Sequence, residues 1–263
     1  MTGTIIPALS VVDVRKTFGH VHALRGVTFD LHPGEVLSVV GDNGAGKSTL
    51  VKILAGVHGA DAGTITSGGE RVSIPTPAAA RAHGIATVFQ DLALCDNLDV
   101  VSNLFLGREV GDFTLNEEEM EKHSWSLLRQ LSAKIPSVRI AVASLSGGQR
   151  QTVAIARSLI GDPQVVILDE PTAALGVAQT AEVLNLIENL RERGLGVVLI
   201  SHNMADVQAV ADRVVVLRLG RNNGDFRIPD VSYEEIISAI TGATDNAVTR
   251  RNSARLPHED SNS

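Results

Sequence analysis

The chain has 263 residues, 44% of them hydrophobic and 20% charged, which predicts a globular protein long enough to bury a substantial core. Its formal net charge is −7, which argues against a nucleic-acid binder that works through a broad basic surface. Only 3% of the residues are aromatic, so we expect a core built mainly from Val, Leu, Ile and Ala.

The cysteine count and the hydropathy limit where the chain can work. Its one cysteine, Cys95, excludes an intramolecular disulfide, which fits a reducing compartment. Residues 1–10 lack the basic segment and the apolar run of a signal peptide. No stretch approaches the roughly 18 uncharged apolar residues of a membrane span. We therefore expect a soluble chain that would need a partner to supply any membrane spans.

The first third of the chain has the pattern of short strands joined by turns. Residues 10–40 alternate between apolar and polar side chains and contain Pro33-Gly34, which is typical of antiparallel strands with a turn. Residues 36–40 form an apolar strand that runs directly into a glycine-rich stretch. The elements expected next are a hairpin over residues 64–66 and 71–74, a short helix over 77–83 and a strand over 85–89.

Helices dominate the pattern of the middle of the chain, residues 91–160. Asn116 can cap a helix whose first turn, residues 117–119, is acidic, and acidic side chains are favourable at the positive end of a helix. A second helix is expected over about residues 149–160, where Gly161-Asp162-Pro163 stops it.

Two continuous apolar runs follow, residues 165–168 and 197–200. Such runs are typical of strands buried on both faces of a parallel sheet. A helical stretch over 177–193 lies between them and would make a crossover connection. Residues 213–221 are expected to form a late strand and turn. The chain from residue 242 onward is polar and lacks periodicity, so we expect a flexible tail.

A glycine-rich segment between the strand over 36–40 and an apolar helix near Leu50 matches the pattern G-x-x-x-x-G-K-[ST]. Its residues are Gly41, Asp42, Asn43, Gly44, Ala45, Gly46, Lys47, Ser48 and Thr49. The glycines let backbone N–H groups point at phosphate oxygens, and the following helix adds the positive end of its dipole. Lys47 would reach the β- and γ-phosphates, and Ser48 would offer a hydroxyl to Mg²⁺. A turn that merely caps a helix is the alternative, and the flanking strand and helix disfavour it.

Two carboxylates, Asp169 and Glu170, stand at the carboxyl end of the apolar strand over 165–168. Ligands of open α/β sheets bind at that edge. Asp169 is suited to hold Mg²⁺ through water, and Glu170 can face an attacking water as a general base. A solvated acidic turn would look the same in isolation, but a phosphate loop on the same sheet favours the catalytic interpretation.

The residues Leu145, Ser146, Gly147, Gly148 and Gln149 precede the second helix. Ser146 and Gln149 have the spacing of a capping box, so the segment can simply begin a helix. Gly147 and Gly148 are poor helix formers that a cap does not need. They would allow a phosphate to approach the bare N–H groups of the helix end. These residues alone leave both interpretations open.

Taken in chain order, these segments together with Gln90 and His202 resemble the ATPase domains of ABC proteins. The stretch Leu-Ser-Gly-Gly-Gln over residues 145–149 is the most diagnostic part, because other phosphate-loop enzymes lack it. The resemblance covers about residues 9–241.

The family resemblance implies an α/β fold. It consists of a phosphate-loop ATPase core with a mainly parallel sheet, an N-terminal antiparallel β subdomain and an inserted helical subdomain over about residues 91–160. The implied domain organisation is a single ABC ATPase domain over 1–241, followed by the polar tail over 242–263.

The resemblance also implies roles for individual residues. Phe18 would stack on adenine, Gln90 would sense Mg²⁺ and the lytic water, and His202 would hold the γ-phosphate. The expected catalytic set is Lys47, Gln90, Glu170 and His202. The expected Mg²⁺ set is Ser48, Gln90 and Asp169. The expected ATP-binding set is Phe18, the loop 41–49, Ser146, Gly147, Gly148 and Gln149.

In this family Ser146, Gly147 and Gly148 would contact the γ-phosphate of ATP held by the opposite subunit. Function then requires two copies of the chain, arranged head to tail, with two composite ATP sites. The segment 173–176 departs from the family pattern, which usually reads Ser-Ala-Leu-Asp, because Gly176 replaces the aspartate that helps couple the two sites. We expect hydrolysis to persist and the communication between the sites to be affected.

Residues 90–94, 98–100 and 103–109 resemble the ATPases of bacterial monosaccharide importers of the ribose and fructose types. The resemblance implies an ATP-hydrolysing subunit on the cytoplasmic face of the inner or plasma membrane. It would drive import through a separate transmembrane permease, served by a periplasmic or extracellular solute-binding protein. No nucleic-acid partner is expected.

Two alternatives stay beside the importer subunit. A soluble ABC ATPase of DNA repair or translation would need long heptad coiled coils, or two fused domains with basic inserts, and the chain shows neither. A regulatory nucleotide-binding module without turnover is disfavoured by the presence of both Glu170 and His202.

Overall fold

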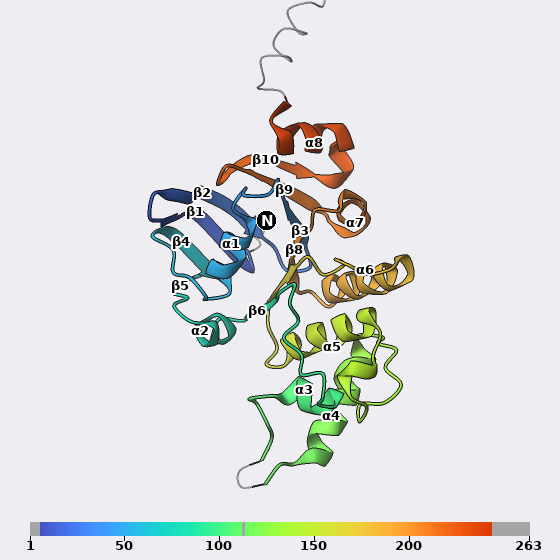
Figure 1. The fold of residues 1–263 in the computed structure, drawn as a ribbon. Coiled ribbons are helices and arrows are strands. Elements are labelled where there is room, and N and C mark those ends of the chain that lie inside the picture. Colours follow the sequence, from blue (N-terminus) through green and yellow to red (C-terminus); the bar gives the residue numbers. More distant parts are fainter. Residues whose placement is uncertain (1–5, 112–113, 244–263) are drawn as a thin grey trace, which may run out of the picture.

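The computed structural model describes residues 6–111 and 114–243 of the chain (Figure 1). Most of the predicted tail over 242–263 therefore lies outside the described residues. The described part contains two sheets with helices between and around them, and the expected order of an antiparallel region, a helical region and parallel strands is confirmed.

The N-terminal sheet is antiparallel and has the strand order β2-β1-β4-β5. Leu9 on β1 pairs with Leu31 on β2 and with Ser67 on β4, so β1 lies between β2 and β4. The turn of the predicted hairpin, between β4 and β5, contains Gly68 and Gly69, both with positive φ. The strands are β1 Leu9–Phe18, β2 Val21–Leu31, β4 Ala62–Ser67 and β5 Glu70–Val72.

The larger sheet has the strand order β10-β9-β3-β8-β7-β6, and all neighbours are parallel except β10 and β9. Val39 on β3 lies opposite Ile200 on β8, and Ile200 lies opposite Asp169 on β7. This register brings the carboxyl ends of three strands to one edge. The strands are β3 Val36–Val40, β6 Ile85–Val88, β7 Val165–Asp169, β8 Gly196–Ile200, β9 Arg213–Arg218 and β10 Arg221–Arg227.

Alternate side chains of the buried strands enter two different cores, one on each face of the larger sheet. One face packs with α1 Lys47–Leu54 and the antiparallel sheet, through Leu37, Val39, Val165, Ile167, Val198 and Ile200. The other face packs with α5 Gly147–Leu159 and α6 Val177–Glu192, through Val36, Val40, Val166, Leu168, Val197 and Leu199. Because both faces are covered, the strands are apolar throughout, and each such side chain contributes about 1.5–3 kcal/mol of burial free energy.

The helical region lies at one end of the molecule, below the sheets in Figure 1. As predicted, the Asn116 side chain caps a helix by accepting a hydrogen bond from the N–H of Glu119. The helical region contains α3 Val100–Phe105, α4 Glu117–Gln130 and a single 3₁₀ turn over Val142–Ser144. A separate short helix, α2 Pro77–Ala82, leads to β6.

Parts of the C-terminal quarter were not expected from the sequence. These elements are α7 Met204–Val210, strand β10, a 3₁₀ turn over Ile228–Asp230 and α8 Tyr233–Thr241. β10 has no buried residue and carries mainly polar side chains, so it lacks the apolar alternation that predicts a strand. Among the helices of residues 6–111 and 114–243, none is both long and apolar enough to span a membrane.

Candidate functional site

The glycine-rich loop connects β3 directly to α1, as the sequence predicts, and three of its glycines have positive φ. A Cβ atom on Gly46 would lie 2.7 Å from Cδ2 of Leu24, and its φ is +108°. A Cβ atom on Gly41 would overlap the backbone oxygen of Leu217. Gly44 has φ +80° and open space around it. The loop therefore needs glycine for its own packing as well as for close approach by a ligand.

Lys47 is the first residue of α1, and its Nζ points back into the loop. The ammonium donates to the backbone oxygens of Gly41 at 2.6 Å and Asp42 at 3.2 Å. Burial lowers the pKa of Lys47, and the negative charges of Glu170, Asp42 and Asp169 oppose that shift. A half-buried cation that is held by carbonyl oxygens alone at the start of a helix suits an anionic ligand.

Asp169 ends β7 at the edge where the loop leaves β3. Burial raises the pKa of this carboxyl, repulsion by Glu170 raises it further, and Lys47 and Lys52 oppose the shift. The described residues contain no cluster of three or more His, Cys, Asp or Glu side chains that could hold a metal by itself. Mg²⁺ is usually bound by one or two carboxylates together with substrate phosphates. Asp169 with the hydroxyl of Ser48 fits that donor set.

Glu170 directly follows Asp169, and hydrogen bonds hold both its backbone and its side chain. Its φ is +52°, and its backbone N–H donates to the oxygen of Ile200 on the neighbouring strand. Its Oε2 lies 2.7 Å from Nδ1 of His202 and also accepts from the backbone N–H of His202 at 3.4 Å. The Glu170 side chain is 15% exposed, whereas His202 is 74% exposed. The sheet thus joins the predicted base and the predicted histidine into one hydrogen-bonded pair.

Gln90 follows β6 and is exposed. It lines a groove of about 490 Å³ together with Glu170, Gly147 and the residues 173–175. The structure therefore brings Gln90, the predicted catalytic carboxylate of Glu170 and the first residue of α5 to one surface depression.

Ser146 caps α5, and the predicted capping box is present. The Ser146 Oγ accepts from the N–H of Gln149 at 3.3 Å, and the Gln149 Oε1 accepts from the N–H of Ser146 at 3.0 Å. The Gln149 Nε2 also donates to the backbone oxygen of Lys134 at 2.8 Å. The helix begins at Gly147, about two residues earlier than predicted, because Ser146 provides its cap.

The segment 146–149 therefore has a structural role in the free chain, and of its two glycines only Gly147 is exposed. Gly148 is buried under α6, where an added Cβ would come within 3.4 Å of Gln179. The side chain of Ser146 lines a groove with Lys134 and Glu182, apart from the groove that contains Glu170. In the described residues no hydrogen bond connects Ser146 to the phosphate loop.

Phe18 lies at the end of β1 with 42% of its surface exposed. Its ring has an edge contact with His58 at a centroid distance of 5.2 Å, and the Lys16 Nζ lies 5.3 Å from its centroid. This partly exposed ring, rather than a buried core phenylalanine, is the geometry that stacking on a base requires.

Several connections around the site were not found from the sequence. Arg157 on α5 donates to the backbone oxygens of Leu92 at 2.6 Å and Ala93 at 2.8 Å, and thereby holds the segment after Gln90. The Thr172 hydroxyl donates at 2.6 Å to Oδ2 of the buried Asp206. Such contacts join residues that are far apart in the chain, and no local sequence pattern predicts them.

Gly176, which departs from the family pattern, is the N-cap of α6. Its backbone is extended, with φ −74°, and its N–H donates to the Oε1 of Gln179 at 3.3 Å. A Cβ added here would meet no atom within 4 Å. Neither backbone strain nor lack of space explains the glycine at this position.

A strand, a glycine-rich turn and a helix that surround a half-buried lysine beside two strand-end carboxylates define a phosphate-binding α/β protein. The chain belongs to the ABC transporter family, whose family model matches residues 24–173. The family expected from the loop, the Leu-Ser-Gly-Gly-Gln stretch and the acidic strand end is confirmed, as is the fold class.

Named relatives align over nearly the whole chain. The xylose/arabinose import ATP-binding protein of Sulfolobus acidocaldarius is 44% identical, over 89% of this chain and 93% of its own. The fructose import ATP-binding protein of Rhizobium meliloti is also 44% identical, over 90% of this chain and 95% of its own.

Solved structures of ATP-binding cassettes share the fold. An ADP conformation of an ABC transporter cassette superposes with a TM-score of 0.78 at 26% identity, over 94% of this chain and 98% of that one. A dimeric post-hydrolysis state of another cassette, bound to ADP and Pi, has a TM-score of 0.70 at 25% identity, over 84% of this chain and 98% of that one.

Proposed function

We propose that this chain is the ATP-hydrolysing subunit of an ABC importer for a monosaccharide. The observation that supports it most directly is the convergence of Lys47, Asp169, Glu170 and His202 at one sheet edge, in a chain that is similar along its length to sugar import ATP-binding proteins. The alternatives of a soluble, non-transport ATPase or a regulatory module have no comparable relative among these matches.

The substrate is ATP, and each part of the site has a task in its hydrolysis. The loop N–H groups and Lys47 bind the phosphates, and Phe18 stacks on the adenine. Glu170 accepts a proton from the attacking water, while Lys47 and His202 stabilise the charge that develops on the γ-phosphate. Mg²⁺, held by Ser48 and Asp169 with Gln90 beside it, would neutralise charge on the phosphate oxygens.

His202 has two ring nitrogens with different partners. Because Nδ1 faces the carboxylate of Glu170 at 2.7 Å, that nitrogen carries the proton in the hydrogen bond. Nε2 remains for another partner and donates to phosphate when the ring is protonated. In this arrangement Glu170 orients the imidazole as well as the water.

Two copies of the chain complete the sites. The N-terminal turn of α5 from one copy, with Ser146, Gly147 and Gly148, contacts the γ-phosphate held by the loop of the other. Ser146 can do so without losing its cap, because its Oγ accepts from Gln149 and its hydroxyl hydrogen is free to donate. In this proposal Gln149 positions Ser146, and its side chain is already occupied by backbone partners.

The membrane-spanning part of the importer is a separate permease, which the chain contacts near Gln90 from the cytoplasmic side. A solute-binding protein on the other side of the membrane delivers the sugar. Closing and reopening of the two copies around ATP is the mechanical event that the permease receives.

The first experiment is Mg²⁺-dependent ATP hydrolysis by the purified chain at increasing chain concentration, beside Glu170→Gln. We expect a rate that rises faster than linearly with concentration and falls at least about 100-fold in the variant, which should still bind ATP. Turnover near the wild-type rate in Glu170→Gln would remove Glu170 from its role. Absence of both hydrolysis and ATP-induced dimerisation would overturn the proposed function.

A further inference from the structure

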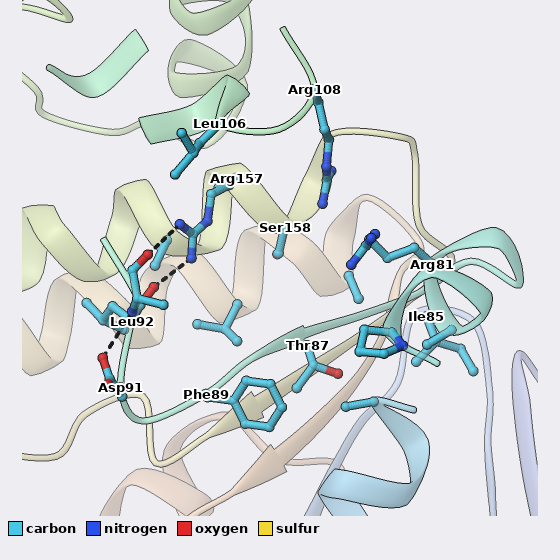
Figure 2. Close-up of a pocket in the computed structure, with 17 residues that line it drawn as sticks. Arg81, Ile85, Thr87, Phe89, Asp91, Leu92, Leu106, Arg108, Arg157 and Ser158 are labelled. Carbon is cyan, nitrogen blue, oxygen red and sulfur yellow. Dashed lines mark hydrogen bonds between the residues drawn. The ribbon is translucent and has the colours of Figure 1, made fainter. Parts of the chain in front are cut away.

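Side-chain contacts hold the chain where it leaves the strands that lead to the predicted catalytic residues. The segment after Gln90 is held from α5. Figure 2 shows the Arg157 guanidinium in the groove beside that segment, where it donates to the backbone oxygens of Leu92 and Ala93. The segments that follow β7 and β8 are held differently, because a side-chain contact joins them to each other.

That contact is a hydrogen bond between Thr172 and Asp206, which are 34 positions apart in the chain. The Thr172 Oγ1 donates to the Asp206 Oδ2 at 2.6 Å. Thr172 lies two residues after Glu170, and Asp206 lies four residues after His202, in the first turn of α7. The bond therefore connects the same two segments that the Glu170–His202 hydrogen bond connects, at a second point.

Asp206 depends on Thr172 because the rest of the chain offers its carboxylate little. Its exposed fraction is 6%. Within residues 6–111 and 114–243, no cationic side chain lies within ion-pair distance of Asp206, and the Thr172 hydroxyl is its one hydrogen-bond donor. An acidic residue at the start of α7 would favour the helix from an exposed position as well. The helix alone therefore does not explain a buried carboxylate, whose burial is costly without a partner.

The turn that contains Thr172 has an unusual backbone. Glu170 has a φ of +52° and Ala174 a φ of +61°. Residues other than glycine rarely adopt such values, which persist only where surrounding contacts hold them. The Glu170 N–H donates to the oxygen of Ile200 at 2.9 Å, and the Ala173 N–H donates to the oxygen of Glu170 at 3.1 Å. Thr172 lies inside this tight turn, so its side-chain bond fixes the turn against α7.

We propose that Thr172 and Asp206 are positioning residues for ATP hydrolysis, which hold the segments after β7 and β8 together so that Glu170 stays directed at the attacking water. The inference rests on the proposed function, in which Glu170 is the base. One bond between two segments lets them turn about it, whereas two bonds fix their relative orientation. A displacement of about 1 Å can cost a catalytic group roughly 100-fold in rate.

The positioning role predicts a loss in turnover without a loss in ATP binding. In the described part of the chain, neither Thr172 nor Asp206 has a side-chain hydrogen bond to the phosphate loop. Thr172→Val removes the hydroxyl at nearly constant volume, and Thr172→Ser keeps it. We expect kcat to fall about ten-fold in Thr172→Val while the Kd for ATP stays within about two-fold. Thr172→Ser should bring kcat back to within about three-fold of the wild type.

Ser38→Ala is the matched control. Ser38 is fully buried on the same sheet, and its Oγ donates to the backbone oxygen of Leu199 at 3.1 Å, so this variant also loses one hydroxyl hydrogen bond. It should be less stable than the wild type and keep its kcat. If Thr172→Val does not fold, the double variant with Asp206→Asn tests the same contact without leaving a buried charge unpaired.

A second readout does not need turnover. In the nucleotide-free chain labelled with ¹⁵N-histidine, the Nδ1 signal of His202 reports on its bond to Glu170, and His202→Ala assigns that signal among the eight histidines. We expect the signal to change in Thr172→Val and to return in Thr172→Ser, because the second bond fixes the position of the first.

A wild-type kcat or an unchanged His202 signal in Thr172→Val would overturn the inference and leave the proposed function intact. So would a fall in kcat that Thr172→Ser does not reverse, or an equal fall in Ser38→Ala, because the Thr172 hydroxyl would then not be the cause. A wild-type chain that hydrolyses no ATP would instead count against the proposed function, and the His202 signal would still test the contact.

Discussion

The Nδ1 of His202 lies 2.7 Å from the Oε2 of Glu170, although the two residues are 32 positions apart in the chain. The contact exists because β7 and β8 are parallel neighbours, so the residues that follow them emerge at the same edge. This hydrogen bond orients the carboxylate of Glu170, which we propose as the catalytic base, and the imidazole of His202 relative to each other.

The first prediction concerns His202→Ala. The side chain is largely exposed, so its loss should change the free energy of unfolding by no more than about 0.5 kcal/mol. Turnover of ATP should fall about 100-fold, because the variant loses both the orienter of Glu170 and a donor to the γ-phosphate. Steady-state kinetics beside the exposed-turn control His20→Ala measures this, and an unchanged kcat would contradict the assigned role.

The second prediction compares two lysines of the same helix. Lys47→Ala should weaken ATP binding at least about ten-fold, because a charged hydrogen-bond donor to the phosphates is lost. Lys52→Ala removes the same charge from an exposed position of α1 and should bind ATP nearly as the wild type does. Titration with a fluorescent ATP analogue separates the two variants. Equal losses would mean that only the net charge of α1 matters.

The third prediction concerns the glycines of the phosphate loop. Gly46→Ala should lower the free energy of unfolding by about 3 kcal/mol, because it adds a clash with Leu24 to an unfavourable positive φ. Gly44 also has a positive φ, but the space around it is open, so Gly44→Ala should lower the free energy of unfolding by about 1 kcal/mol. Urea unfolding of the nucleotide-free chains gives both values. Equal destabilisation would show that the loop relaxes around the added methyl group.

The fourth prediction follows from the raised pKa of Asp169, which burial and the neighbouring Glu170 cause. A carboxyl with a higher pKa in the folded chain binds protons more readily there, so its contribution to stability falls as pH rises through the window above its ordinary pKa. Asp169→Asn should therefore make the nucleotide-free chain more stable at neutral pH.

That advantage of Asp169→Asn should shrink as pH falls below the ordinary carboxyl range, where the wild-type group is protonated as well. Chemical unfolding at a series of pH values measures the difference, and the exposed Asp30→Asn serves as the control. A variant that is less stable than the wild type at neutral pH would show that Asp169 makes a favourable charged contact instead.

The fifth prediction restores the residue that the family carries at position 176. Gly176→Asp should fold normally, because the backbone is extended and a Cβ meets no atom within 4 Å. If an aspartate here couples the two ATP sites, the Hill coefficient for ATP should rise in this variant. Gly176→Ala, which adds the Cβ without the carboxylate, should behave like the wild type. Identical cooperativity in all three chains would show that residue 176 does not couple the two ATP sites.

The local chemistry of the site could be predicted from the sequence. The loop around Lys47, the strand that ends at Asp169 and the cap at Ser146 are each defined by residues within one short segment. Short-range backbone geometry decides such features: glycine permits positive φ, and a serine hydroxyl reaches an N–H three residues on. The continuous apolar runs likewise indicate strands that are covered on both faces.

The C-terminal elements β10 and α8 were harder to predict because their structure depends on contacts with neighbouring strands. β10 is polar along its length, and it is a strand only because β9 offers it a free edge. α8 packs beside the same two strands, so its place follows from theirs. Local propensity gives no signal for contacts of this kind, which override it.

The sequence by itself determined which segments carry the phosphate loop, the carboxylates and the capped helix, because each depends on near neighbours along the chain. Only the tertiary structure decided that Glu170 meets His202 and that Gln90, Glu170 and Gly147 line one groove. Those relationships depend on strand order and on which helix face packs against which sheet. Many strand orders are compatible with the same local pattern, and the packing of the whole core selects one.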